Sequence, residues 1–315
     1  MKRTHLSNFA LPTCFAAMAI LCFVIVAQPT TAAAQEREVL GYGYLFTNDH
    51  FGDSEDRWRT ASSVLSLVRG YKWTGSRPDT FGEIVEFRFG GEIIAPSKLA
   101  PRASGDRRYA GVLTFGIHTH LNASGAEIST GVDLVLVGQQ TGMAKVQNKV
   151  HRFFGKMPPK CLNDQIENST RLRGTVEIAK SYKYGLLKVR PFFELSVGVE
   201  EVARFGFDAF WGLAGRDNLL LRDVTTGHLY YGTNHGVADL TVVVGGDYAA
   251  VGDSIYLPDN EGPSVKRRRS RLRAGLHWQN PEGMSLFYGL TYLTEEFLGQ
   301  NEGQMIGSLN VNFSF

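Results

Sequence analysis

The chain has 315 residues and a formal net charge of +2, so its overall charge does not indicate a nucleic-acid partner. It contains 35 glycines, 20 phenylalanines and 12 tyrosines but only 11 prolines. After residue 30 no run approaches the roughly 20 consecutive apolar residues of a membrane helix. The composition therefore argues against a helical membrane protein and favours an all-β chain.

The first 34 residues have the features of a secretory signal peptide. Lys2 and Arg3 give a positive start, residues 15–27 form a short apolar core, and Ala32–Ala34 supply the small residues that precede cleavage. An uncleaved anchor helix is the alternative, but the apolar run is short for it. We expect a signal peptide at residues 1–34 and a mature domain at residues 35–315.

Cleavage would remove two of the three cysteines and leave Cys161 alone. An exported chain with one cysteine has no internal disulfide. Cys161 could be a nucleophile or an ordinary loop cysteine, and we favour the second because reactive thiols are rare in exported proteins.

Segments of about ten residues, in which apolar residues alternate with small or polar ones, recur along the mature chain. This pattern is typical of a membrane β-barrel, whose strands place apolar side chains toward lipid and polar ones toward the lumen. The twelve segments cover residues 38–47, 60–72, 83–91, 107–121, 126–138, 169–181, 187–199, 203–213, 237–251, 266–278, 284–294 and 307–315.

Charged residues in these segments favour a closed barrel over a soluble β-sandwich. Glu86, Arg88, Glu194 and Asp208 alternate with apolar residues, and they would be unfavourable facing lipid. A barrel turns them inward and leaves no open sheet edge in the membrane. The last segment, which ends on Phe315, also resembles the C-terminal strand of bacterial outer-membrane barrels. We predict a twelve-stranded antiparallel transmembrane β-barrel in the outer membrane.

Strand parity predicts which connections lie outside the cell. In an even-numbered barrel both termini lie on the periplasmic side and the longer loops lie outside. The outer loops would then include residues 48–59, 92–106 and 139–168. We expect a short helix within residues 146–155 of the third loop, ended by Gly155. Gln147 and His151, four residues apart, would share one face of it.

These three loops collect side chains that are able to perform chemistry, although each has an ordinary interpretation. Asn48-Asp49 at a strand end is often turn chemistry, and a loop histidine such as His151 is often structural. Cations suit the phosphates of lipopolysaccharide without any catalysis. The predicted phosphate-binding residues are Lys98, Arg102, Lys149 and Arg152.

The sequence resembles the outer-membrane lipid A 3′-O-deacylases in ordered motifs. The most specific are VQNKVHRFFG at residues 146–155 and DQIEN at residues 164–168. The other matching residues are Asn48-Asp49, Asp56-Arg57 with Thr60, Ser97-Lys98, Gly105-Asp106-Arg107 and Thr294-Glu295-Glu296-Phe297. The resemblance spans essentially the whole mature chain.

This resemblance implies a calcium-dependent hydrolase that removes the 3′-linked acyloxyacyl group of lipid A. It implies His151 as general base, worth about 10²–10⁴-fold in rate, and Asp49 with Asn48 as calcium ligands. It implies that Thr60 and Gln147 orient water, ligand or base. The corresponding cation of the family is Lys98. The expected acid after the helix is absent, because the chain continues as Lys156-Met157.

Two other functions remain open from the residues. The first is a non-catalytic barrel, either a channel or a lipopolysaccharide-binding structural protein. The second is a hydrolase acting on phospholipid rather than lipid A. The enzyme hypothesis predicts lipid A as substrate, Ca²⁺ as cofactor, a site facing the cell exterior, a monomer, and no nucleic-acid partner.

Overall fold

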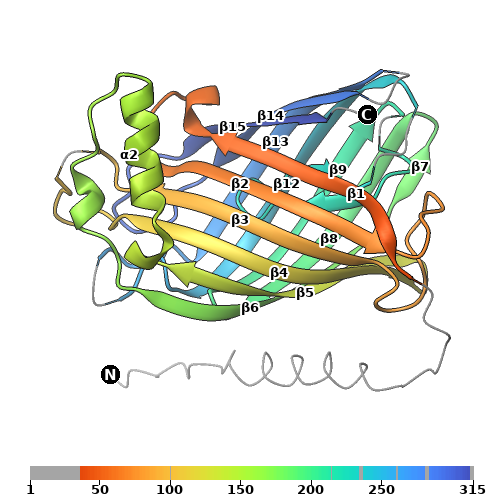
Figure 1. Ribbon diagram of the computed structural model, residues 1–315, viewed down its shortest axis with the longest axis horizontal. Helices are drawn as coiled ribbons and strands as arrows, with labels where there is room; N and C mark the ends of the chain where they lie inside the picture. The colour runs from red at the N-terminus through yellow and green to blue at the C-terminus, as the bar shows by residue number, and fades with distance from the viewer. Residues whose placement is uncertain are drawn as a thin grey trace, which may run out of the picture. The chain divides into compact units, whose positions relative to one another are not determined.

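Each of the predicted alternating segments forms a strand of an antiparallel β-barrel in the computed structural model (Figure 1). The structure describes residues 36–99, 101–213, 215–233, 237–259, 262–280 and 284–312. The predicted signal peptide, residues 1–34, lies outside this part of the chain, as do the last three residues of the predicted C-terminal strand.

Twelve strands form the ring. They are β1 (Glu38–Asn48), β2 (Trp58–Gly70), β3 (Val85–Ala95), β4 (Ala110–Ala123), β5 (Ala126–Val137), β6 (Ser169–Ala179), β8 (Leu187–Val197), β9 (Glu200–Trp211), β12 (Asp239–Ser254), β13 (Arg268–Gln279), β14 (Ser285–Leu293) and β15 (Gln304–Asn312). Each strand pairs with the next along the ring, and β15 pairs with β1 to close it. The short β7 (Tyr182–Tyr184) pairs with the start of β8. The prediction of a twelve-stranded antiparallel barrel is confirmed.

The alternation of side chains explains why the sheet closes. Phe87 and Phe89 of β3 and Leu134 of β5 point outward and are exposed, whereas Glu86 and Asp133, which alternate with them, are buried inside. Inside the ring the charged groups pair with one another; His118, for example, contacts Asp133 at 2.8 Å. One surface therefore suits lipid and the other suits a polar interior.

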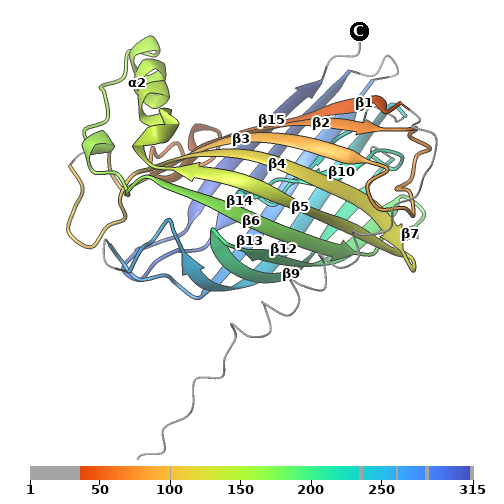
Figure 2. The same ribbon diagram turned by 60° about the horizontal axis from the view of Figure 1, so that its bottom comes forward.

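The two ends of the barrel differ. We call the end at which β1, β3 and β5 finish the helical rim, and the opposite end the terminal rim. The helical rim carries α2 (Met143–Phe153) and the short 3₁₀ turns η1 (Asp49–Phe51), η2 (Gln139–Thr141) and η3 (Cys161–Asn163), and Figure 2 shows α2 at that end. No helix among the described residues is both long enough and apolar enough to cross a membrane.

A hairpin that the sequence did not predict fills part of the lumen. It consists of β10 (Leu220–Arg222) and β11 (Leu229–Tyr231), which lie in the connection between β9 and β12 at the terminal rim. Its Leu219, Leu221 and Tyr230 pack against inward-facing residues of the barrel wall, such as Leu45, Val64, Val68 and Phe287. We call residues 219–232 the plug.

The backbones of the barrel wall and of the plug approach each other closely at a glycine. A Cβ atom added to Gly43 of β1 would lie 2.8 Å from the Tyr231 carbonyl oxygen, so only glycine fits there without displacing the plug. The hydroxyl of Tyr230 also lies 2.9 Å from Ser66 Oγ of β2. The plug is therefore an integral part of the barrel interior.

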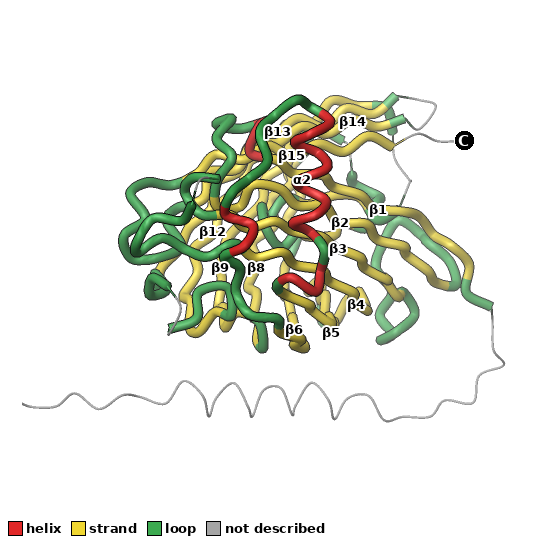
Figure 3. Tube along the Cα trace, turned by 60° about the vertical axis from the view of Figure 1, so that its left-hand side comes forward, coloured by secondary structure: helices red, strands yellow, loops and turns green. Residues whose placement is uncertain are grey.

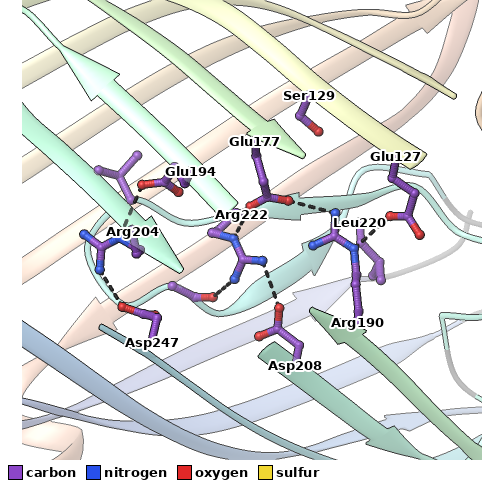
Figure 4. Close-up of polar contacts among 12 residues, drawn as sticks. Glu127, Ser129, Glu177, Arg190, Glu194, Arg204, Asp208, Leu220, Arg222 and Asp247 are labelled. Atoms are coloured by element: carbon purple, nitrogen blue, oxygen red, sulfur yellow. Dashed lines mark hydrogen bonds and ion pairs between the residues drawn. The ribbon is translucent and has the colours of Figure 1, made fainter. Parts of the chain in front are cut away.

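Ion pairs join the plug to the opposite wall (Figure 4). Arg222 of β10 contacts Glu177 of β6 and, at 2.8 Å, Asp208 of β9. Asp208 is also 2.9 Å from Arg273 of β13. Because each of these charges has an opposite-charge partner, attraction within the network offsets the cost of removing the charges from water.

Candidate functional site

Helix α2 carries two predicted site residues on one face. Gln147 and His151 are one turn apart and are the buried residues of the helix. The helix ends close to the predicted position: Gly155 has a φ of 68°, which favours glycine, and the Lys156 amide donates to the His151 carbonyl at 2.8 Å.

The buried face of α2 packs on the outward surface of the barrel wall, at β3 and β4 (Figure 3). Gly111 follows the same alternation as the exposed Phe115, and a Cβ added to it would lie 2.8 Å from Met143 Cβ of α2. Gly91, which pairs with the outward-facing Leu113, has Met143 as its nearest neighbour. The side chains beneath α2 therefore face the lipid side of the wall and not the lumen.

The imidazole of His151 is held by a main-chain carbonyl. Its Nδ1 atom lies 3.1 Å from the carbonyl oxygen of Met157. A carbonyl only accepts hydrogen bonds, so Nδ1 carries the proton and Nε2 is the basic nitrogen of the neutral ring. Where an acid was expected after the helix, the chain thus supplies the backbone oxygen of Met157.

The basic nitrogen of His151 faces a carboxylate from another loop. Nε2 lies 3.3 Å from Asp56 Oδ2, in the connection between β1 and β2. Asp56 can accept a hydrogen bond from the protonated ring and stabilise its charge. Lys156 approaches the same oxygen at 3.8 Å.

Asp56 was part of a motif in the sequence resemblance but received no role from it. Its contact with His151 joins segments far apart in the chain, so no local spacing could reveal it. The available signal was the Asp-Arg pair four residues before a threonine, placed in the first loop of the rim.

Thr60 connects Asp56 with the predicted metal-binding residue Asp49. Its hydroxyl donates to Asp56 Oδ1 at 2.9 Å and also lies near the Asp49 carboxyl. The backbone from Asp49 to Thr60 contains Ser54 and Trp58 at positive φ, 63° and 48°. Such conformations are uncommon in non-glycine residues and concentrate at functional sites.

Asp49 follows the end of β1 and is almost fully buried, with 2% of its surface exposed. Burial raises the pKa of this carboxyl to about 8; the neighbouring Thr60 hydroxyl opposes the rise, and the nearby Asp56 adds to it. Among the described residues, no cationic side chain forms a salt bridge with Asp49. A carboxylate in this position can gain charge compensation from a bound cation.

Asn48 is placed beside Asp49 but is engaged with the backbone. Its side-chain oxygen accepts a hydrogen bond from the His50 amide at 2.9 Å and so caps η1. The turn interpretation of Asn48-Asp49 therefore holds for Asn48. The same oxygen keeps a second lone pair that is able to bind a cation.

Gln147 has an unsatisfied oxygen. Its Oε1 atom is buried and has no hydrogen-bond partner in the described structure. Buried polar atoms are nearly always paired, so an orphaned oxygen on the face that carries His151 indicates a position for a ligand, a water molecule or a cation.

The four predicted phosphate-binding cations are distributed over the rim. Lys149 and Arg152 lie on the exposed face of α2, and Lys98 is exposed in the loop after β3. Arg102 differs, because its guanidinium forms an ion pair with Asp164 and donates to the Asp106 carbonyl at 3.0 Å. The structure thus gives Arg102 a role in joining two loops, and its binding of substrate stays a prediction.

Several other motif residues build the scaffold of the rim. Asp106 accepts hydrogen bonds from the amide and hydroxyl of Ser97, and Arg107 pairs with Glu296. Arg59 pairs with Glu296 and Glu92, both at 2.8 Å. These contacts fix the loops that present Asp49, Asp56 and His151 without contributing to the site itself.

Cys161 has the properties of a structural cysteine. It is buried in a cluster with Ile93, Ala95 and Tyr109, and burial raises the pKa of its thiol to about 11. A thiol with such a pKa is a poor nucleophile near neutral pH.

The donors present fit a cation bound through oxygen atoms. In the described ranges of the chain no three or more His, Cys, Asp or Glu side chains gather as a metal cluster. Calcium, however, also accepts amide, main-chain and water oxygens. The uncompensated carboxylate of Asp49 and the orphaned Oε1 atom of Gln147 are donors of this kind.

Comparison with known proteins identifies the family and the fold. The family model described as outer membrane protein LpxR matches residues 15–315. The solved structure of LpxR from Salmonella typhimurium has a TM-score of 0.71 and 18% identity, and the alignment covers 87% of this chain and 100% of that one. The β domain of the Bordetella autotransporter BrkA has 10% identity over 87% of this chain and 99% of its own, with a TM-score of only 0.43.

Proposed function

Because the chain belongs to the outer membrane protein LpxR family, we propose that it is a hydrolase that removes the 3′-linked acyloxyacyl chain of lipid A. The observation that carries this proposal is the convergence of His151, Asp56, Thr60 and Asp49 at the helical rim, where α2 packs on the outward surface of the barrel wall. A lipid substrate can reach such a site from the membrane without entering the lumen.

His151 acts as the general base. Nε2 removes a proton from water as the water oxygen attacks the ester carbonyl, while the Met157 carbonyl keeps the ring in its orientation. Asp56 stabilises the imidazolium that forms. When the tetrahedral intermediate collapses, the same nitrogen returns the proton to the departing sugar oxygen. The products are the acyloxyacyl acid and the free 3′-hydroxyl.

Asp49 would hold calcium, and the side-chain oxygens of Asn48 and Gln147 would be further donors. A bound divalent cation supplies charge that polarises the ester carbonyl and stabilises the oxyanion. Thr60 contacts both Asp49 and Asp56 and so holds the two carboxylates in fixed positions relative to each other.

The helical rim faces the cell exterior in this proposal. Strand parity supports this orientation, since β1 begins and β15 ends at the opposite rim. Lys98, Lys149 and Arg152 would then lie where lipid A phosphates lie and could bind them. The ring closes on itself, so the proposal requires no second copy of the chain.

The plug disfavours the alternative of a channel. It occupies part of the lumen with apolar side chains and with Arg222, which is bound to both Glu177 and Asp208. A phospholipid hydrolase remains the second candidate, because the same groups can hydrolyse any ester that reaches them.

Mass spectrometry of lipid A and phospholipids from cells expressing the protein tests the function. We expect loss of the 3′-acyloxyacyl mass from lipid A, and no loss with His151→Ala or Asp49→Ala. Unchanged lipid A beside new lysophospholipid would replace the proposed substrate by phospholipid. Full activity of His151→Ala would refute the assigned base.

A further inference from the structure

The face of α2 that points away from the barrel exposes large apolar side chains. Phe153 is 84% exposed, Phe154 70% and Met157 85%, and Val146 and Val150 are about half exposed on the same helix. These residues form one continuous segment of the helical rim, at the end of α2 and just beyond it. Grouped apolar exposure of this kind marks a surface with a binding partner.

The same segment is basic and contains no acid. From Met143 to Asn163 the sequence has no Asp or Glu, and Lys145, Lys149, Arg152, Lys156 and Lys160 are all exposed. Lys156 approaches Asp56 at 3.8 Å, whereas the other four form no salt bridge among the described residues. A surface that combines exposed Phe with unpaired cations complements a layer that is apolar below and anionic above.

The lipid-facing wall of the barrel continues directly to this segment. α2 packs on β3 and β4, whose outward-facing Phe89 and Phe115 are exposed to the bilayer just below it. Because the family places the chain in the outer membrane, lipid surrounds these strands. A protein partner of this face of α2 would have to bind at the membrane surface and supply several acidic side chains for the cations. Lipid meets both needs without such a partner.

We propose that residues 143–160 insert into the phosphate-bearing layer of the surrounding lipid, with Phe153, Phe154 and Met157 in the acyl region and the cations at the phosphates. The opposite face of α2 carries Gln147 and His151. The lipid surface thus helps to position the helix that presents these two side chains. The proposal needs the barrel to be in a membrane, but it does not depend on the hydrolase activity.

Spin labelling at Phe153→Cys in reconstituted vesicles tests this. The background is Cys161→Ser, so that the label has one site. Two labelled controls calibrate depth: Leu134→Cys, on the lipid-facing side of β5, and Ser264→Cys, in an exposed loop of the helical rim. The accessibility of each label to oxygen and to a water-soluble nickel chelate is measured in phosphatidylcholine vesicles with and without phosphatidylglycerol.

We expect the ratio of oxygen to nickel accessibility at position 153 to exceed that at position 264 several-fold and to approach that at position 134. Phosphatidylglycerol should raise it further, and the triple substitution Lys145→Gln, Lys149→Gln, Lys160→Gln should abolish that increase. A label at 153 as accessible to nickel as the one at 264, in both lipids, overturns the proposal. Spin–spin broadening would instead show that a second copy covers this face. Gel mobility before and after heating confirms that each variant is a folded barrel, and the label at Phe154→Cys repeats the measurement independently.

Discussion

The Nε2 atom of His151 lies 3.3 Å from the Asp56 carboxylate, while Nδ1 of the same ring lies 3.1 Å from the Met157 carbonyl. The backbone oxygen fixes which nitrogen is basic, and the carboxylate is in place to stabilise the proton that this nitrogen accepts. The two functions are thus divided between a main-chain group and a side chain from a different loop.

Replacing Asp56 should slow the reaction without unfolding the barrel. A hydrogen bond to a charged group contributes ~1.5–3 kcal/mol, so Asp56→Asn should lower kcat about 10- to 100-fold. The measurement is the rate of acyl release from purified lipid A in detergent by the variant and the unaltered protein.

Glu55→Gln is the matched control for this substitution. It neutralises the adjacent carboxylate, which is exposed, and kcat should stay within about twofold of the unaltered protein because surface substitutions have small effects. Equal losses in the two variants would show that general loop charge, not the contact with His151, is responsible.

Calcium binding should be linked to the release of one proton from Asp49. In the metal-free protein burial raises the pKa of Asp49 to about 8, far above its ordinary value of 3.8, so this group favours the folded state fully below about pH 4 and loses that effect as the pH rises through 8. A cation must displace the proton, so its apparent affinity should increase roughly tenfold per pH unit between pH 6 and 8 and then level off.

Calorimetric titration with calcium in buffers of different ionisation enthalpy measures this proton. Asp49→Asn should remove both the proton release and the binding. Calcium affinity that is independent of pH between 6 and 8 would contradict the placement of the cation at Asp49.

The barrel should not conduct ions. The plug occupies part of the lumen with apolar side chains and paired charges, so the unaltered protein should give no steady current in planar bilayers. Replacing residues 219–232 by a short Gly-Ser linker should open a conducting path. A steady ohmic current through the unaltered protein would restore the channel hypothesis.

Loss of the Arg222 side chain should destabilise the barrel strongly. Arg222→Met leaves Glu177 and Asp208 without this partner in a buried interior, and breaking such a pair costs about 3–5 kcal/mol. Urea unfolding in lipid vesicles, followed by tryptophan fluorescence, measures the change in the free energy of unfolding. The same substitution at the exposed Arg171 should change it by less than about 0.5 kcal/mol.

Most of the barrel wall could be predicted because the pattern that forms each strand lies within a short stretch of sequence. Alternation of apolar and polar residues with a period of two is imposed by the pleat, so all twelve strands and the inward direction of Glu86 and Asp208 are readable from the sequence. The short helix is also readable, since Gly155 ends it in the left-handed conformation. The family resemblance drawn from the motifs is confirmed by the match over residues 15–315.

The plug and the partners of His151 could not be predicted in this way. β10 and β11 have three residues each, too few for a period to be visible, and their apolar residues are buried by the surrounding wall rather than by their own pairing. The Met157 carbonyl has no sequence signature, because every residue has a main-chain carbonyl. The contact of Asp56 with His151 depends on where two loops meet at the rim.

The position of the plug links the two sides of the last seam of the barrel. Its apolar side chains lie in one cluster with Leu45 of β1 and Phe287 of β14, and β15, which closes the ring on β1, lies between these two strands. The interior and the seam therefore stabilise one another, so loosening the plug should weaken the closure of the ring.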